Sequence, residues 1–228
     1  MRKVRSGRGK SKDVVKILIA DSQAILVDGV RLLLEQQSKF SVVDAAADGA
    51  DAVHLARQLR PDVAILAIDM SGLNGIEAAQ QIGAVSPSTR VLILSRHSSP
   101  ELICQALRAG AHGYLLKQCC GGKQVVDAVL EVSKGKSYVC NKTSELLNRE
   151  MCDLVKRLTA REREVLRLTM QGGTSAKAAR LLKLSAKTVL SYRGRILRKL
   201  EIHGMPKSIL QRAYGASLAR ALSGGCPP

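Results

Sequence analysis

The sequence predicts two domains: a doubly wound α/β domain built on a five-stranded parallel sheet, and a small all-α helix-turn-helix domain behind it. Two observations lead to this prediction. Five short apolar runs alternate with five helix-like segments through the first 134 residues, which is typical of a parallel sheet covered by helices. The last third of the chain shows helical patterns without strands, and it is strongly basic.

Each strand is predicted from an apolar run that ends in polar or glycine-bearing sequence, as expected for strands buried on both faces. The five runs are residues 16–20, 40–45, 62–67, 90–95 and 113–116. A helix-like segment follows each run, at residues 22–37, 51–59, 76–85, 100–109 and 123–133. Because parallel strands need crossover connections, one helix after every strand fits a doubly wound sheet.

Charge is distributed unevenly along the chain. The net charge of +17 divides into +6 for residues 1–12, −1 for residues 13–139 and +12 for residues 140–228. A near-neutral body joined to a basic C-terminal third indicates a polyanion partner for that third. Residues 1–12 are interpreted as a basic disordered tail. Since no apolar run approaches the roughly 20 residues of a membrane span and no secretory signal is evident, we expect a cytoplasmic protein without a membrane partner.

Polar residues follow several of the predicted strands at their carboxyl ends, where open α/β sheets bind their ligands. Asp21 and Ser22 follow the first strand, Ser95 ends the fourth, and Lys117 follows the fifth. The third strand ends in Ala67, whose methyl group can neither coordinate a metal nor react. The sequence therefore predicts a shallow polar pocket around an inert residue.

Residues 16–134 resemble the receiver domain of a two-component response regulator of the NarL/FixJ type. The resemblance rests on three stretches in the family's order: KILIADSQAILVDGVRLLLE, DGADAVHLARQLRPDVAILAIDMSGLNGIEA and ALRAGAHGYLLK. It implies a flavodoxin-like strand order and a phosphorelay role. In such receivers two adjacent acids after the first strand and a third after the third strand hold Mg²⁺, and the third acid is phosphorylated.

The resemblance implies that this pocket is degenerate. Asp21 matches the first acid, Ser22 replaces the second and Ala67 replaces the phosphoacceptor, whereas Ser95 and Lys117 match the family's hydroxyl and lysine. Mg²⁺ requires near-octahedral oxygen ligation from several carboxylates. We therefore expect a pseudo-receiver without a Mg²⁺ site, without another cofactor and without enzymatic activity of its own.

Three readings of the remaining polar groups stay open. The simplest, which we favour, is that Lys117 pairs with Asp21 and that Ser95 is a satisfied strand-end hydroxyl. A second is that a small molecule or a partner protein binds at the pocket. A third is a phosphorylation switch with a non-standard acceptor, for which Asp69 is a poor substitute.

The basic third of the chain resembles a LuxR-type helix-turn-helix domain, through LTAREREVLRL and LSAKTVLSYRGRILRKL. Thr159 with Glu162 predicts a capped first helix to about residue 171. A second helix is predicted for residues 174–182, and Ser185 caps a third that extends to Leu200. Two short helices followed by a basic helix are typical of a DNA reader that binds a duplex. The alternative is a basic domain that serves protein or membrane contacts.

The resemblance makes the third helix the recognition helix in the major groove. Leu190, Ser191 and Gly194 fall at the base-reading positions. This set offers few base contacts, because only Leu190 and Ser191 have side chains and Gly194 offers only its backbone. Phosphate contacts, which set affinity but not sequence preference, are expected from the remaining candidates: Lys187, Thr188, Arg193, Arg195, Arg198 and Lys199.

These assignments predict a dimeric, sequence-specific transcription regulator that acts independently of aspartyl phosphorylation. The predicted domains are a receiver-like domain at residues 13–134, a linker at 135–156, a helix-turn-helix domain at 157–222 and a tail at 223–228. A fourth helix at residues 206–222 would pair with its copy in a homodimer, since operator half-sites usually mirror protein symmetry; the alternative is that it only closes the small domain. Its dimer candidates are Ile209, Leu210, Ala213 and Tyr214.

Overall fold

The computed structural model describes residues 14–170 and 174–200. The predicted N-terminal tail, the fourth helix and the final tail lie outside the described residues, and so do the dimer candidates Ile209, Leu210, Ala213 and Tyr214. Within the described part of the chain, no helix is both long enough and apolar enough to cross a membrane.

The predicted parallel α/β sheet is confirmed, with the flavodoxin-like strand order β2-β1-β3-β4-β5 and one further strand, β6, at its edge. All neighbouring strands pair in parallel. The strands are β1 (Val15–Ala20), β2 (Phe40–Ala46), β3 (Val63–Leu66), β4 (Arg90–Ser95), β5 (Ala111–Leu116) and β6 (Tyr138–Val139). The crossover helices are α1 (Ala24–Glu35), α2 (Gly49–Leu59), α3 (Gly75–Val85), α4 (Pro100–Arg108) and α5 (Gly122–Ser133).

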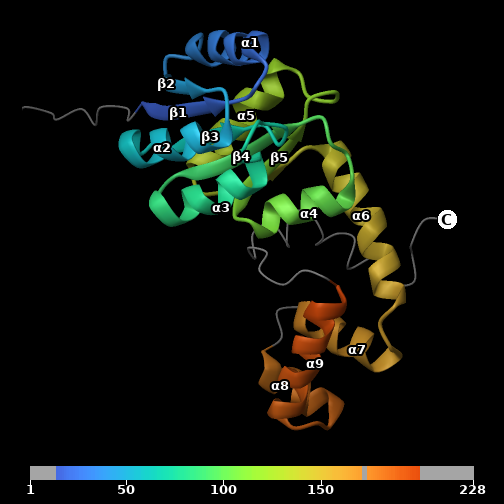
Figure 1. Cartoon of the computed structure of the whole chain (residues 1–228). Helices are drawn as coiled ribbons and strands as arrows, with labels where there is room; N and C mark the ends of the chain where they lie inside the picture. Colours follow the sequence, from blue (N-terminus) through green and yellow to red (C-terminus); the bar gives the residue numbers. More distant parts are fainter. Residues whose placement is uncertain (1–13, 171–173, 201–228) are drawn as a thin grey trace, which may run out of the picture.

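Helices cover both faces of this sheet, with α1 and α5 on one side and α2, α3 and α4 on the other (Figure 1). All four residues of β3 are buried, because the strand lies between β1 and β4 and has a helical layer on each face. This explains why its sequence is a continuous apolar run rather than an alternating one. The parallel pairing of β1, β3, β4 and β5 brings their carboxyl ends to one edge of the sheet.

The structure differs from the five-strand expectation in the segment that was predicted as a linker. Tyr138 and Val139 form β6, which pairs with Gly113 and Tyr114 of β5. The helix α6 (Asn141–Lys156) fills most of the remaining segment and buries apolar residues that include Leu154. Two strand residues are too few to show a periodic pattern, so the sheet edge emerges only from its pairing with β5.

The three predicted helices of the C-terminal domain are confirmed as α7 (Ala160–Met170), α8 (Ser175–Leu182) and α9 (Ala186–Lys199). The predicted cap of α9 forms as expected, because the Ser185 side chain accepts the Thr188 N–H. Thr174 caps α8 in the same way. These helices pack around Val165, Val189 and Ile196, and α6 leads to them from the α/β body (Figure 1).

His112, near the start of β5, makes the stability of the α/β domain dependent on pH. Its Nε2 atom lies 2.9 Å from the Arg90 guanidinium. Burial, together with the Arg90 charge, lowers the pKa of His112 to about 4. In the unfolded chain the pKa of histidine is about 6.5. Between these values the unfolded chain binds a proton that the folded protein does not, so the free energy of unfolding falls as the pH falls.

Replacing His112→Gln is therefore expected to remove part of this pH dependence while keeping a hydrogen-bond acceptor. Between pH 7 and pH 5 the wild-type protein should lose about 1 kcal/mol more stability than the variant, after allowance for solvent screening at a partly exposed ring. Urea unfolding of both proteins at the two pH values measures the difference. Equal losses in the two proteins would contradict this role of His112.

Candidate phosphorylation pocket and DNA-binding surface

The structure brings the five predicted pocket residues together at the carboxyl edge of the sheet. Asp21, Ser22, Ala67, Ser95 and Lys117 all line one cavity of about 230 Å³. Asp21 and Ser22 follow β1, and Ala67, Ser95 and Lys117 lie at the ends of β3, β4 and β5. They meet because the parallel arrangement places these strand ends side by side. The convergence expected from the sequence is therefore present in the fold.

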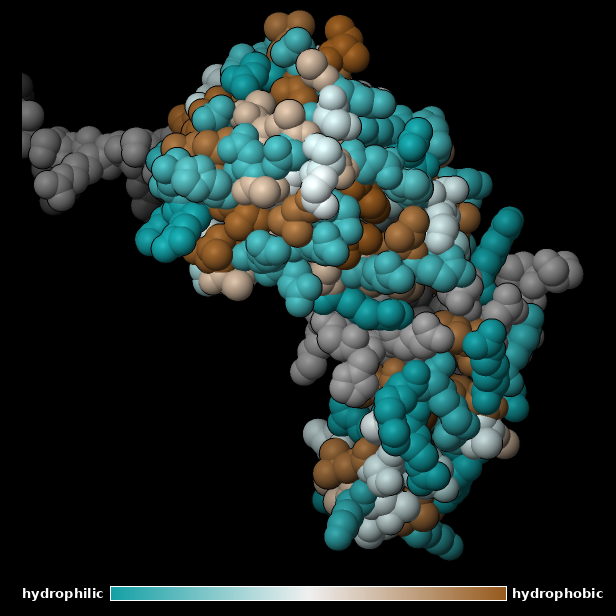
Figure 2. Space-filling view, viewed as in Figure 1, coloured by the Kyte–Doolittle hydropathy of each residue, from teal (hydrophilic) through white to brown (hydrophobic). Residues whose placement is uncertain are grey.

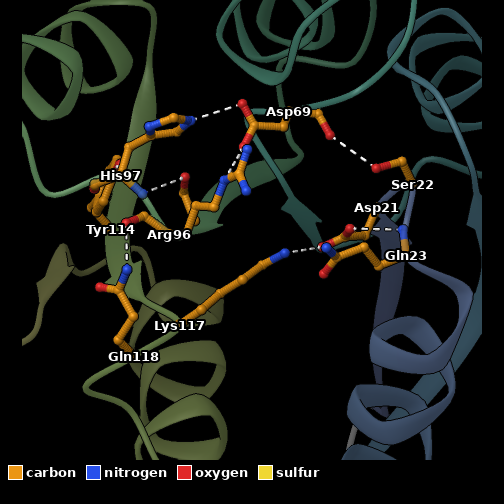
Figure 3. A network of polar contacts seen from close by, with 10 residues as sticks. Asp21, Ser22, Gln23, Asp69, Arg96, His97, Tyr114, Lys117 and Gln118 are labelled. Carbon is orange, nitrogen blue, oxygen red and sulfur yellow. Dashed lines mark hydrogen bonds and ion pairs between the residues drawn. The ribbon is translucent and has the colours of Figure 1, made fainter.

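Asp21 and Lys117 neutralise one another across this cavity (Figure 3). The Lys117 ammonium lies 2.7 Å from Asp21 Oδ2, and the side chains are only 3% and 19% exposed for Asp21 and Lys117, respectively. The other oxygen of Asp21 accepts the Gln23 N–H at 3.0 Å. The pairing that we favoured from the sequence is thus the arrangement in the structure, and it occupies both groups.

Ser22 uses its hydroxyl within the protein as well. Its Oγ donates to the backbone carbonyl of Asp69 at 3.1 Å, so it links the loop after β1 to the loop after β3. Ser95, which is buried, accepts the backbone N–H of His97 at 3.2 Å. Both hydroxyls therefore already have partners in the protein.

The carboxylate of Asp69 points toward Arg96 and His97 in the loop after β4 (Figure 3). Arg96 Nε donates to one of its oxygens at 2.9 Å, and His97 Nε2 lies 2.7 Å from the other. The hydrogen bond with His97 is the main cause that lowers the pKa of Asp69. Asp69 is therefore engaged in an ion-pair cluster that was not predicted from the sequence. The available signal was that Arg96 and His97 directly follow the end of β4, which places them at the same edge of the sheet.

Further hydrogen bonds join this cluster to β5 and to the loop behind it. The Tyr114 hydroxyl donates to the carbonyl of His97 at 2.8 Å, and the Gln118 amide donates to the carbonyl of Arg96 at 2.9 Å. Burial raises the pKa of Tyr114 to about 12, so this hydroxyl keeps its proton and acts as a donor. The loops after β3, β4 and β5 are thus connected through Asp69, Arg96, His97 and Gln118, and Tyr114 joins them to β5 itself.

The donor set of the pocket does not fit Mg²⁺, which needs several oxygen ligands of high charge density. Asp21 is paired with Lys117, the carbonyl of Asp69 accepts from Ser22, and position 67 offers a methyl group. Among the residues that the structure describes, no group of three or more His, Cys, Asp or Glu side chains could hold a metal ion. No metal-dependent step is assigned to this pocket.

The outward face of α9 carries most of the predicted DNA contacts. Lys187, Leu190, Ser191, Arg195 and Arg198 are exposed, and Leu190 is 56% exposed although it is apolar. Figure 2 shows that hydrophilic side chains cover much of the helical body that contains α9.

Other candidates on α9 also have partners inside the domain. Arg193 donates to Ser175 Oγ at 2.9 Å, and Thr188 contacts the capping hydroxyl of Ser185. The Lys199 ammonium lies 2.7 Å from the buried carboxylate of Glu162, so it ties the C-terminal end of α9 to α7. The Arg195 guanidinium stacks on the Tyr192 ring, 4.6 Å from its centre. Their DNA contacts stay predictions.

A receiver-like sheet with its strand-end pocket, followed by a helix-turn-helix body, defines a regulator that couples an input domain to DNA. Residues 17–130 match the family described as "Response regulator receiver domain". Residues 156–210 match the family described as "Bacterial regulatory proteins, luxR family". The chain belongs to the LuxR-type response regulators, which are DNA-binding transcriptional regulators of two-component systems.

Similar proteins span nearly the whole chain. The uncharacterized transcriptional regulatory protein YxjL of Bacillus subtilis is 30% identical over 209 residues, which cover 88% of this chain and 95% of YxjL. The oxygen regulatory protein NreC of Staphylococcus haemolyticus is 34% identical over 207 residues, which cover 86% of this chain and 95% of NreC.

Solved structures resemble the whole chain too. The RcsB response regulator of Salmonella typhimurium is 27% identical, with a TM-score of 0.58 over 84% of this chain and 94% of RcsB. An RcsB–DNA complex is also 27% identical, with a TM-score of 0.56 over 93% of this chain and 99% of the RcsB chain.

Proposed function

We propose that this regulator binds specific DNA sites without aspartyl phosphorylation of its receiver-like domain. The observation that supports the proposal most is the state of the pocket: the position at the end of β3 is Ala67, and the neighbouring Asp21 is neutralised by Lys117 at 2.7 Å. An alanine offers no oxygen for a phosphoryl group. The ammonium that would otherwise meet a phosphoryl oxygen is held by a buried carboxylate.

The ion-pair cluster around Asp69 supports the same proposal. Phosphoryl transfer depends on cations that offset the charge of the transferred group. Here the cationic side chains Lys117 and Arg96 both contact carboxylates of the protein itself. The loops after β3 and β4 are also linked directly through Asp69, so their connection does not require a phosphoryl group.

DNA binding is assigned to α9, which we place in the major groove, whereas α8 crosses the DNA backbone. RcsB is a dimer on DNA in one solved structure, and we propose that this chain also acts as a homodimer in the cytoplasm. The exposed basic residues of α9 would contact phosphates, whereas Leu190 and Ser191 would reach base edges.

The test compares DNA binding and phosphorylation in the full-length protein. Duplexes are first enriched from a randomised pool, and their affinity is then measured with and without acetyl phosphate and Mg²⁺. We expect the same affinity in both conditions and no shifted band in phosphate-tag electrophoresis. A stable phosphoryl group mapped to Asp69 or Asp21, together with tighter DNA binding, would replace this proposal with a phosphorylation switch that uses another acceptor.

The salt dependence of DNA binding tests the role of Arg198. This residue is exposed on the outward face of α9, unlike Lys199, whose charge is partly offset by Glu162. Replacing Arg198→Gln should weaken binding to all duplexes to a similar extent and should reduce the slope of log affinity against log salt by about one unit. Fluorescence anisotropy at several salt concentrations measures this slope.

Arg57→Gln serves as the matched control, because Arg57 is exposed on α2 of the α/β domain. It should leave the slope unchanged. An altered sequence preference with an unchanged slope in Arg198→Gln would assign base reading, and not phosphate contact, to Arg198.

A further inference from the structure

Gly194 lies in the interior of α9, where glycine is the least favourable residue apart from proline. Glycine costs a helix stability because it has more backbone freedom to lose on folding. A side chain at such a position would favour the helix, so the effect of the glycine depends on what a side chain there would meet, inside the protein or in a partner.

Packing inside the protein explains the glycines at the first positions of α3 and α5, but not Gly29, Gly83 and Gly194, which lie inside helices and have no neighbour near a Cβ position. A Cβ atom at Gly75 would collide with the backbone of Ala67, and one at Gly122 would lie 2.8 Å from a methyl group of Leu33. At Gly194 a Cβ atom would find no neighbour within 4 Å. The fold itself thus leaves room for a side chain at this position.

The position of Gly194 on α9 distinguishes it from Gly29 and Gly83. Val189 and Ile196 are buried and define the inner face of the helix. Lys187, Ser191 and Arg198 are exposed, and their spacing from Gly194 places all four residues on the opposite face. Gly194 is therefore a gap in the middle of the basic face that we assign to DNA.

We propose that Gly194 determines specificity by letting the backbone of α9 approach the floor of the major groove closely. This inference rests on the proposed function. The close approach brings Leu190 and Ser191 within reach of base edges, where Leu190 contacts a thymine methyl group and Ser191 forms a hydrogen bond. A side chain at position 194 lifts the helix away from the bases while the basic residues still reach the phosphates.

The test uses full-length Gly194→Ala and Gly194→Gln with the duplex that the wild-type protein enriches from a randomised pool. Both replacements favour the helix, so the melting temperature should stay the same or rise. The affinity for the enriched duplex should fall roughly tenfold for Ala and further for Gln, as expected when base contacts are lost. The affinity for a scrambled duplex should change much less, because phosphate contacts dominate it.

Gly83→Ala and Gly83→Gln are the matched controls. Gly83 lies inside α3, is exposed, and also has no atom within 4 Å of a Cβ position. These variants should show a similar rise in melting temperature, and their affinities for the enriched and the scrambled duplex should not change.

Three results would overturn the inference. Unchanged affinity and unchanged enriched sequence in both Gly194 variants would overturn it while the proposed function stands. A lower melting temperature that accounts for the lost affinity would place the need for glycine inside the fold. A wild-type protein that enriches no sequence would overturn the proposed DNA function as well.

Discussion

Replacing Ser22→Asp and Ala67→Asp together is expected to turn a protein that acetyl phosphate does not label into one that it labels. Position 67 ends β3 and lines the pocket beside Asp21, Ser95 and Lys117. An aspartate there supplies the missing nucleophile. An aspartate at position 22 supplies a further carboxylate, and it also removes the hydroxyl that now occupies the Asp69 carbonyl.

The two replacements are expected to act together and not additively. Ala67→Asp alone offers an acceptor but leaves only two carboxylates to hold the metal, at positions 21 and 67, because Asp69 is engaged with Arg96 and His97. One of the two, Asp21, is paired with Lys117. Two carboxylates hold Mg²⁺ weakly, and a carboxylate without the ion is a poor phosphoryl acceptor because the charge of the transferred group is not offset. Ser22→Asp alone lacks the acceptor altogether.

Phosphate-tag electrophoresis after incubation with acetyl phosphate and Mg²⁺ measures the outcome for all four proteins. We expect fast labelling of the double variant, little labelling of Ala67→Asp, and none of Ser22→Asp or the wild type. Omission of Mg²⁺ should abolish labelling of the double variant. Equal labelling of Ala67→Asp and the double variant would show that Ser22 does not limit the pocket.

Replacing Lys117→Met is expected to lower the free energy of unfolding by about 3–5 kcal/mol, because it leaves the carboxylate of Asp21 buried without its partner. The methionine is similar in length, so little packing is lost. Adding Asp21→Asn should restore most of the stability, since a neutral amide in the same place carries no charge to compensate. The urea-induced unfolding transition of the α/β domain, followed in the full-length protein, gives these free energies.

A surface ion pair provides the control. Arg31 and Glu35 on α1 are 3.8 Å apart and partly exposed, so Arg31→Met should cost no more than about 0.5 kcal/mol. If Lys117→Met costs no more than Arg31→Met, the Asp21–Lys117 pair is not the buried, mutually dependent unit that the structure shows.

Local signals in the sequence were sufficient for most of the architecture. Apolar runs that end in polar sequence predicted β1 to β5, and capping residues such as Thr159 and Ser185 predicted the starts of α7 and α9. These features depend on neighbours a few residues apart. The inert residue at the sheet edge was also readable, because a strand end places its residue at that edge whatever the remaining packing is. That position 67 matches the phosphoacceptor of receiver domains is what the resemblance implies.

Only the tertiary structure decided which groups are partners across long sequence separations. The two residues of β6 become a strand by pairing with β5. Lys199, a predicted DNA contact, forms an ion pair with Glu162 of α7. Asp69 meets Arg96 and His97 because the loops after β3 and β4 lie at one edge of the sheet. Such ion pairs and short edge strands leave no periodic pattern in the chain, since their geometry depends on how the whole sheet and its loops assemble.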